Sequence, residues 1–475
     1  MNSTLYVVAQ KELREITRDG RVRVLFAIVL TLTLAALVFG AQQTYKAAQA
    51  RQQAKERAQT QWESQGEKNP HVAAHYGTHV FAPTSVATAI DPGVSAYLGR
   101  SIRIEAHRRN LASHASAQEG AALQRHGGFS VALVLYLLVP LLLIALGYGM
   151  WSRERERGTL KQVLSTGIDR RTLLWGKATA LFGALMALLL PAGILILGVL
   201  WWIGGGGSSV VFRLALLALC YILYLGTFGA LALYASAVAT TSRTSLVTMI
   251  GLWGLFCLII PRLGTEVAGF TVPLPSQAEL SNAIASSLEN GIDGKTTQDD
   301  AVEKIITALM KEQNLANAGM LMDEAELNGI ELRAEARWED QIYDHHIAEF
   351  QQQLTNQEKV GAMVGLLSPY VAIRNLSAGL CGTDLAHHQH FSAHTEQWRK
   401  IFVDYLNKAF AKDSGAEGWD YRAGPELWKK APPFSYQEPG TDFAIGNHML
   451  SLGALLFWFA LAFFLALASS RRVRV

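Results

Sequence analysis

Three histidines near residue 70 are the residues whose type and spacing most directly suggest chemistry. His71, His75 and His79 recur at intervals of four residues. On a helix this spacing places three imidazoles along one face, where together they could bind zinc or copper. Pro70 could begin such a helix, but Gly77 interrupts it. The alternative interpretation is a loop in which these histidines pack or form hydrogen bonds.

A second group of polar residues could ligate a metal in the same way. It comprises Asp384, His387, His388, His390 and His394. The alternative here is a plain polar surface. Elsewhere no HExxH motif is present and no acid–base pair stands out. The three cysteines form neither a CxxC motif nor a disulfide framework. We therefore expect no catalytic site, and a metal would be the only cofactor bound directly.

ATP hydrolysis by this chain is also not expected. Gly294, Lys295 and Thr296 resemble the end of a phosphate-binding loop of the Walker A type. That motif requires a glycine five residues earlier, and Glu289 occupies the position. Without the glycine-rich turn the backbone cannot surround a phosphate.

The most patterned polar segment is residues 152–177, which lies between two long apolar runs. It is strongly basic, and its excess of positive charge predicts a cytoplasmic loop between two membrane spans. Asp169 stands where the N-cap of the next helix is expected. A charged, helix-prone loop with an apolar ridge at Leu160, Val163 and Leu164 suits the docking of a soluble partner. The alternative is a loop whose charges only set the membrane orientation.

The elements around these sites are predicted to be helices that cross a membrane. Half of the 475 residues are hydrophobic and only 17% are charged, well below the roughly 25% of a soluble protein. The fold class we expect is therefore an all-α polytopic membrane protein with a mainly helical extracytoplasmic domain built from two insertions. The six expected spans are 24–41, 129–151, 178–203, 212–239, 246–261 and 448–469.

Basic clusters predict which side of the membrane each connection occupies. Residues 1–23, 152–177 and 470–475 carry these clusters, so both termini are expected in the cytoplasm. The long polar insertions 42–128 and 262–447 are then expected outside it. The net charge of +3 is small, and we expect no nucleic-acid partner.

Residues 1–23 contain an amphipathic helix that we expect to lie on the inner membrane surface in contact with lipid. Lys11, Glu12, Arg14 and Arg18 occupy its polar faces. We expect it to precede an uncleaved first span.

The two insertions are expected to be rich in helix. Residues 42–65 should continue the first span as a helix, and 322–353 and 395–410 have helical composition and spacing. No run convincingly predicts a strand. Pro261 is expected to close the fifth span.

The predicted spans carry no ionisable side chains in their interiors. A pump or an ion-coupled carrier normally keeps such groups at membrane depth. If this protein moves a substrate, the energy must therefore arrive from a partner.

Two segments resemble those of ABC-2 type transporter permeases. One is Lys11-Glu12-Leu13-Arg14-Glu15 with Arg18-Asp19-Gly20-Arg21 before the first span. The other is Glu154 to Leu160, with Leu164-Ser165-Thr166, Arg170 and Gly176-Lys177 after it. The large insertions resemble those of a subgroup whose extracytoplasmic domain has no assigned function. The membrane part of that subgroup is similar to the permease of nitrous-oxide reductase maturation.

The resemblance implies a permease subunit of an ABC transporter. It also implies export, a direction that suits the family better than import. It implies that 152–177 is a coupling helix docked in a groove of a separate ABC ATPase subunit, which carries the ATP and magnesium. It also implies a homodimer or a pair with a similar permease, in a bacterial inner membrane, with an outer domain free to meet a periplasmic protein. The implied docking residues are Glu154, Glu156, Arg157, Gly158, Thr159, Leu160 and Leu164.

Another class of function stays open on the sequence alone. The histidine-containing outer domain would also suit a membrane-anchored metal-binding maturation factor or a sensor. An associated ATPase favours the transporter, whereas tightly bound metal without an ATPase favours the alternative.

Overall fold

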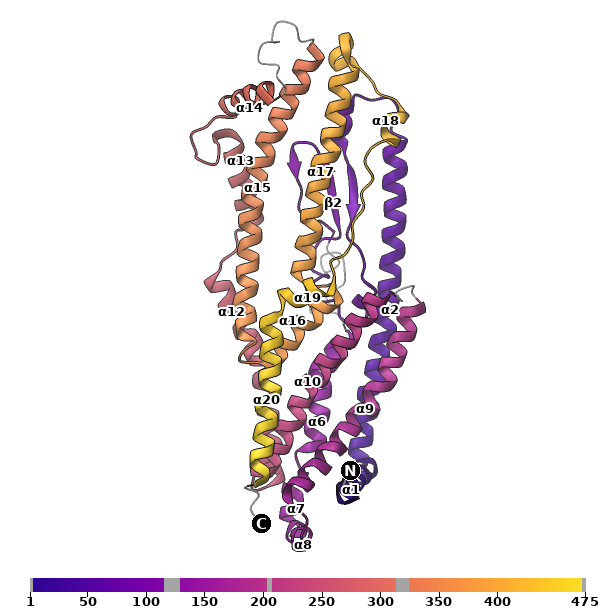
Figure 1. The fold of residues 1–475 in the computed structure, drawn as a ribbon, viewed down its shortest axis with the longest axis vertical. Coiled ribbons are helices and arrows are strands. Elements are labelled where there is room, and N and C mark those ends of the chain that lie inside the picture. The colour runs from indigo at the N-terminus through magenta and orange to yellow at the C-terminus, as the bar shows by residue number, and fades with distance from the viewer. Residues whose placement is uncertain (1–2, 115–128, 203–206, 313–323, 472–475) are drawn as a thin grey trace.

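The computed structural model describes residues 3–114, 129–202, 207–312 and 324–471. The molecule is elongated, with apolar helices in one half and polar helices beside a small sheet in the other (Figure 1). We call these the apolar half and the polar half. Both ends of the described chain lie at the far end of the apolar half. Residues 472–475 of the expected tail 470–475, and Ile203, the last residue of the expected third span, lie outside the described residues.

Six helical segments among the described residues are long and apolar enough to cross a membrane, which confirms the predicted fold class. A helix suits a bilayer because its backbone groups form hydrogen bonds within the segment. The segments are Gly20–Glu63, Val131–Glu156, Arg170–Val199, Ser208–Val238, Ser242–Thr271 and Met449–Arg471.

The fifth apolar segment does not end at the proline where the sequence predicted its end. Helix α11 (Ser242–Gly254) continues through a π-helical turn, η4 (Leu255–Ile259), into α12 (Ile260–Thr271). Pro261 is the second residue of α12, just beyond that wider turn, which accommodates the missing backbone N–H. The second segment repeats this arrangement, with η3 (Val134–Leu138) before Pro140 in α6 (Val139–Gly147).

Helix α2 (Gly20–Glu63) joins the two halves. Asp19 caps its start by accepting a hydrogen bond from the backbone N–H of Arg21, at 2.9 Å. The first half of α2 packs in the apolar half, and the second half extends as the predicted polar helix beside the sheet (Figure 1). Trp62 is buried near its end, in the core of the polar half.

The polar half contains strands that the sequence analysis did not predict. Strands β1 (Thr78–Phe81), β2 (Ser101–Glu105) and β3 (Arg108–Arg109) form an antiparallel sheet in the order β1-β2-β3. In β2 the apolar residues Ile102 and Ile104 alternate with polar ones and are buried. The strands are four, five and two residues long, too short to stand out as periodic runs.

Helices surround this sheet and confirm the helical predictions for 322–353 and 395–410 within the described residues. Long helices α15 (Glu324–Val364) and α17 (Leu385–Asp413) lie side by side (Figure 1). The remaining elements between the halves and around the sheet are α3 (Pro70–Tyr76), η1 (Val86–Ala89), α13 (Gln277–Asn290), α14 (Gln298–Glu312), α16 (Pro369–Cys381), η5 (Gly415–Asp420), α18 (Pro425–Lys429) and α19 (Thr441–Asn447).

Candidate partner-docking site

The first part of the basic segment 152–177 forms a helical tip at the same end of the molecule as both chain ends (Figure 1). Helix α7 (Ser152–Glu156) and helix α8 (Thr159–Ser165) are joined by Arg157 and Gly158. Gly158 has a φ of 72°, a left-handed conformation that glycine adopts without steric cost. We call residues 152–165 the tip. Asp169 accepts a hydrogen bond from the N–H of Arg171, so it caps the helix that follows, as predicted.

The start of α7 is tied to the fourth apolar helix, α10 (Ser208–Val238). The backbone N–H groups of Trp151 and Ser152 donate to the hydroxyl oxygen of Ser236, at 2.9 and 3.2 Å. These N–H groups belong to the first turn, which has no partners within the helix. Ser236 therefore fixes where the tip leaves the apolar half.

Successive charges of α7 contact different helices. Arg155 donates to the backbone carbonyl oxygens of Ala237, at 2.6 Å, and Ala239 at the end of α10. Glu156 accepts from the N–H of Ser242 at the start of α11, at 2.8 Å. The helix dipole stabilises a cation at the C-terminus of a helix and a carboxylate at the N-terminus. The alternating charges thus join the tip to two consecutive helices.

Glu154 points into a cluster of charges between three elements. Its carboxylate lies 2.6 Å from the ammonium of Lys11 in α1 (Ser3–Arg18) and 3.0 Å from that of Lys177 in α9 (Arg170–Trp202). Glu12 of α1 pairs with the same ammonium groups, at 3.1 and 2.6 Å. We call Lys11, Glu12, Glu154 and Lys177 the ion cluster. It connects α1, the tip and α9.

The ion cluster is largely removed from water. The side chains of Lys177 and Glu12 are 1% and 5% exposed, whereas that of Lys11 is 43% exposed. Burial lowers the pKa of Lys11, but the neighbouring Glu12 and Glu154 more than offset this, so its pKa lies above its usual value. Lys177 also lies over the ring of Trp151, 5.4 Å from the centroid. Each buried charge therefore has an opposite charge within contact distance.

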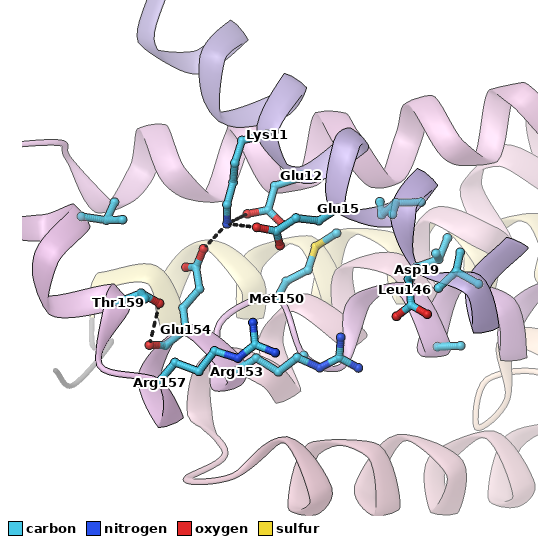
Figure 2. A pocket seen from close by; sticks show the side chains of 15 residues that line it. Lys11, Glu12, Glu15, Asp19, Leu146, Met150, Arg153, Glu154, Arg157 and Thr159 are labelled. Atoms are coloured by element: carbon cyan, nitrogen blue, oxygen red, sulfur yellow. Dashed lines mark hydrogen bonds and ion pairs between the residues drawn. The ribbon is translucent and has the colours of Figure 1, made fainter.

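A cavity of about 230 Å³ lies beside the ion cluster, between α1 and the tip. Figure 2 shows Lys11 reaching Glu12, Glu15 and Glu154, with Arg153 and Arg157 extended along another side of the cavity. Packing between α1 and the tip is incomplete at this place. The ion pair between Lys11 and Glu154 links α1 to the tip beside this cavity.

Close packing against α9 sets the position of α1. A Cβ atom added to Gly176 would lie 2.4 Å from Cγ1 of Val8, so the contact requires glycine. Arg14 and Arg18, the other predicted polar residues of this helix, are exposed.

The predicted docking residues divide into two sets in the structure. Glu156, Arg157, Gly158 and Thr159 are exposed. Leu164 is half-buried, and Leu160 is 1% exposed because it packs in the main apolar core. Glu154, already engaged in the ion cluster, belongs with Leu160 among residues that hold the tip in place.

Sequence reasoning did not find the partners of the tip charges. Glu154 is 143 residues from Lys11, and Glu156 is 86 residues from Ser242. No local spacing links residues so far apart. The signal available was the alternation of Arg and Glu from Arg153 to Arg157, which places charge on all sides of α7.

The structure brings together two of the three histidines expected to share a helix face. His71 and His75 lie in α3, which ends at Tyr76 before Gly77, whose φ is 64°. His79 follows in β1 and is not in the group. The third imidazole beside His71 and His75 is His107, which the sequence analysis missed.

The second polar group does not converge in the same way. Asp384 accepts hydrogen bonds from the rings of His387 and His448, and its pKa lies below its usual range because those contacts outweigh burial. His390 contacts the hydroxyl of Tyr436, and His394 contacts the carbonyl oxygen of Ser435. His388 lies close by in α17. In the described part of the chain, the group around His71 is the one whose ligand atoms converge.

Comparison with known families supports the resemblance seen in the sequence. The family model described as "ABC-2 family transporter protein" matches residues 6–472. A search of curated proteins gives no match. The matched range includes most of α1, the tip, the six apolar segments and the polar half.

Proposed function

The chain belongs to the ABC-2 family of transporter proteins, and from this premise we propose that its tip docks a separate ATPase subunit. Family membership makes it a permease component of an ABC transporter and a multi-pass membrane protein. Such a component is a non-catalytic subunit that works with an ABC ATPase. The proposal concerns where that ATPase binds and how its motion reaches the spans.

The exposed face of the tip is the proposed contact surface. Arg157, Thr159, Lys161 and Gln162 are exposed there, and Gly158 allows a close turn between the two short helices. The inward-facing Glu154 and Leu160 are occupied within the chain. The outward charge is therefore mainly basic and complements an acidic groove.

The observation that carries this proposal is the attachment of the tip to four helices. Glu154 joins it to α1 and α9, Arg155 to the end of α10, and Glu156 to the start of α11. A displacement of the tip would therefore move all four helices together. ATP and magnesium, bound between two partner ATPase subunits, would draw two such tips toward each other.

We further propose a homodimer, or a pair with a similar permease, that exports its substrate. The basic tip and both chain ends would then face the cytoplasm of a bacterial inner membrane, with α1 lying against lipid. The polar half would face outward. There it could receive or release substrate, or bind a periplasmic protein.

A double charge reversal at the tip tests the docking surface. The full chain with Arg157→Glu and Lys161→Glu is purified from native membranes in mild detergent, and co-purifying ATPase is quantified. Because both side chains are exposed, the fold should persist while ATPase recovery falls at least tenfold. Leu160 is unsuitable for this test, since a polar residue there would disrupt the core.

The matched control reverses two exposed lysines of α14 in the polar half, Lys304→Glu and Lys311→Glu. It makes the same change in net charge and should retain the ATPase. Full ATPase recovery with the tip variant would contradict the proposal, as would equal loss from both variants.

A further inference from the structure

Three imidazoles from two separate segments meet in the polar half. Asn69 caps α3 by accepting from the N–H groups of His71 and Val72, which positions His71 and, one turn later, His75. His107 comes from the turn between β2 and β3, where its φ is 59°. Nε2 of His71 lies 3.0 Å from Nε2 of His75 and 3.4 Å from Nε2 of His107.

These separations match those of a metal site. Zinc–imidazole bonds of about 2.0–2.1 Å in a tetrahedral arrangement place ligand nitrogens about 3.3 Å apart. All three ligand atoms lie within 4.8 Å of one another. A small adjustment of the rings would therefore place one ion at bonding distance from all three.

Two of the rings are held by partners on their far side. Nδ1 of His71 lies 3.0 Å from the amide oxygen of Asn407, and Nδ1 of His107 lies 2.7 and 2.9 Å from the carboxylate oxygens of Glu339. Both Nδ1 atoms must therefore donate. Carboxylate and amide oxygens orient metal-binding histidines in this way in known sites.

The direction of these hydrogen bonds determines whether each Nε2 atom carries a hydrogen or a lone pair. In a neutral ring whose Nδ1 carries the hydrogen, Nε2 carries a lone pair. The Nε2 lone pairs of His71 and His107 then face each other, and His75 can supply a hydrogen to only one of them. A metal cation between the three rings would accept every one of these Nε2 lone pairs. The alternative is that an additional proton binds one of the Nε2 atoms and is shared with its neighbour.

We propose that His71, His75 and His107 bind a divalent transition-metal ion, Zn²⁺ or Cu²⁺, through their Nε2 atoms. Asn407 of α17 and Glu339 of α15 are positioning residues for the rings. His71 is buried, but His75 is exposed, so the fourth coordination position faces solvent. An ion held there would connect α3 and the β2–β3 turn to the two long helices.

The first experiment measures stoichiometry and affinity on the full-length chain in detergent. The protein carries an affinity tag without histidine, is stripped with a chelator, and is titrated with Zn²⁺ and, separately, Cu²⁺ against a chromophoric competitor. We expect one tightly held ion per chain. His75→Gln and His107→Gln should each weaken binding at least tenfold.

Two further variants separate ligation from general damage. His79→Gln, on the neighbouring strand outside the cluster, should bind the ion like the unmodified chain. Glu339→Gln keeps all three ligands but removes the carboxylate, and should weaken binding roughly 10–100-fold. Each variant is compared by circular dichroism and elution volume.

Three outcomes would overturn the site: no stoichiometric ion on the unmodified chain, unchanged affinity in folded His75→Gln and His107→Gln, or equal weakening in His79→Gln. Binding of Cu²⁺ but not Zn²⁺ with the same histidine dependence would support the site and assign it to copper.

Discussion

At the scale of single residues, the ion cluster shows how burial changes the value of a charge. Lys177 and Lys11 contact the same carboxylates, yet Lys177 is 1% exposed and Lys11 is 43% exposed. Water can solvate the ammonium group of Lys11 when a carboxylate partner is lost, but it cannot reach the ammonium group of Lys177. The two lysines therefore form a natural matched pair for mutation.

We expect Lys177→Met to destabilise the protein more than Lys11→Met. Removing the buried ammonium leaves Glu12 and Glu154 with one half-exposed lysine between them, a loss of about 3–5 kcal/mol for a broken buried pair. Removing Lys11 should cost about 1 kcal/mol or less. Thermal unfolding in detergent, followed by tryptophan fluorescence, measures both. Equal effects, or the reverse order, would show that the cluster is not buried as described.

The histidines show, at the same scale, how a local pattern can mislead. The four-residue interval correctly relates His71 to His75, because one turn of helix separates them. It fails for His79, because Gly77 ends the helix and a strand follows. The residue that replaces it, His107, is 36 positions from His71 and shares no spacing with it.

At the scale of secondary-structure elements, α1 packs most closely against α9 at Gly176. Gly176 leaves room for Val8, and a Cβ at that position would lie 2.4 Å from its Cγ1. The two helices cannot separate without stretching the nearby ion pair between Glu12 and Lys177. The contact therefore positions Lys11 and Glu12 for the ion cluster.

We predict that Gly176→Val displaces α1 and speeds tryptic cleavage in residues 3–18 several-fold in detergent. Gly193→Val is the matched control, because it lies in the same helix and an added Cβ meets nothing within 4 Å. Its cleavage rate should equal that of the unmodified chain. If Gly176→Val is cleaved no faster than the control, α1 is not held by this contact.

The element scale also shows why helices were predicted well and the strands were not. A helix of 29 or 41 residues, such as α17 or α15, repeats its pattern over many turns. Strand β2 offers one alternation, Ile102 to Ile104, within five residues. Residues 101–105 form a strand because they pair with β1 and β3, and these partners lie elsewhere in the chain.

At the scale of the whole molecule, the tip and both chain ends share one end, and the polar half forms the other (Figure 1). Six apolar segments return the chain to the side where it began. The basic segment 152–177 and the amphipathic helix α1 lie at the end that carries the tip. This arrangement makes the orientation in the membrane a testable property of the molecule.

Thiol labelling of intact spheroplasts tests that orientation. The native residues Cys220, Cys257 and Cys381 are buried and should remain silent. A membrane-impermeant reagent should label Lys412→Cys in the polar half and should label Gln162→Cys at the tip only after the membrane is opened; both positions are exposed. The opposite pattern of labelling would place the tip outside and remove the proposed ATPase site.

The sequence by itself determined the six apolar segments, the helical insertions, the basic tip and the family resemblance. These features depend on composition, run length and short motifs, which are local properties of the chain. They indicated which segment should meet an ATPase and which residue types could bind a metal.

Only the tertiary structure decided which side chains face outward and which partners they meet. Glu154 was expected at the partner surface, but it pairs with Lys11 and Lys177 because α1 and α9 pack against the tip. His107 joins His71 because a hairpin turn lies beside α3. Contacts between distant segments come from packing, and no local pattern in the chain encodes them.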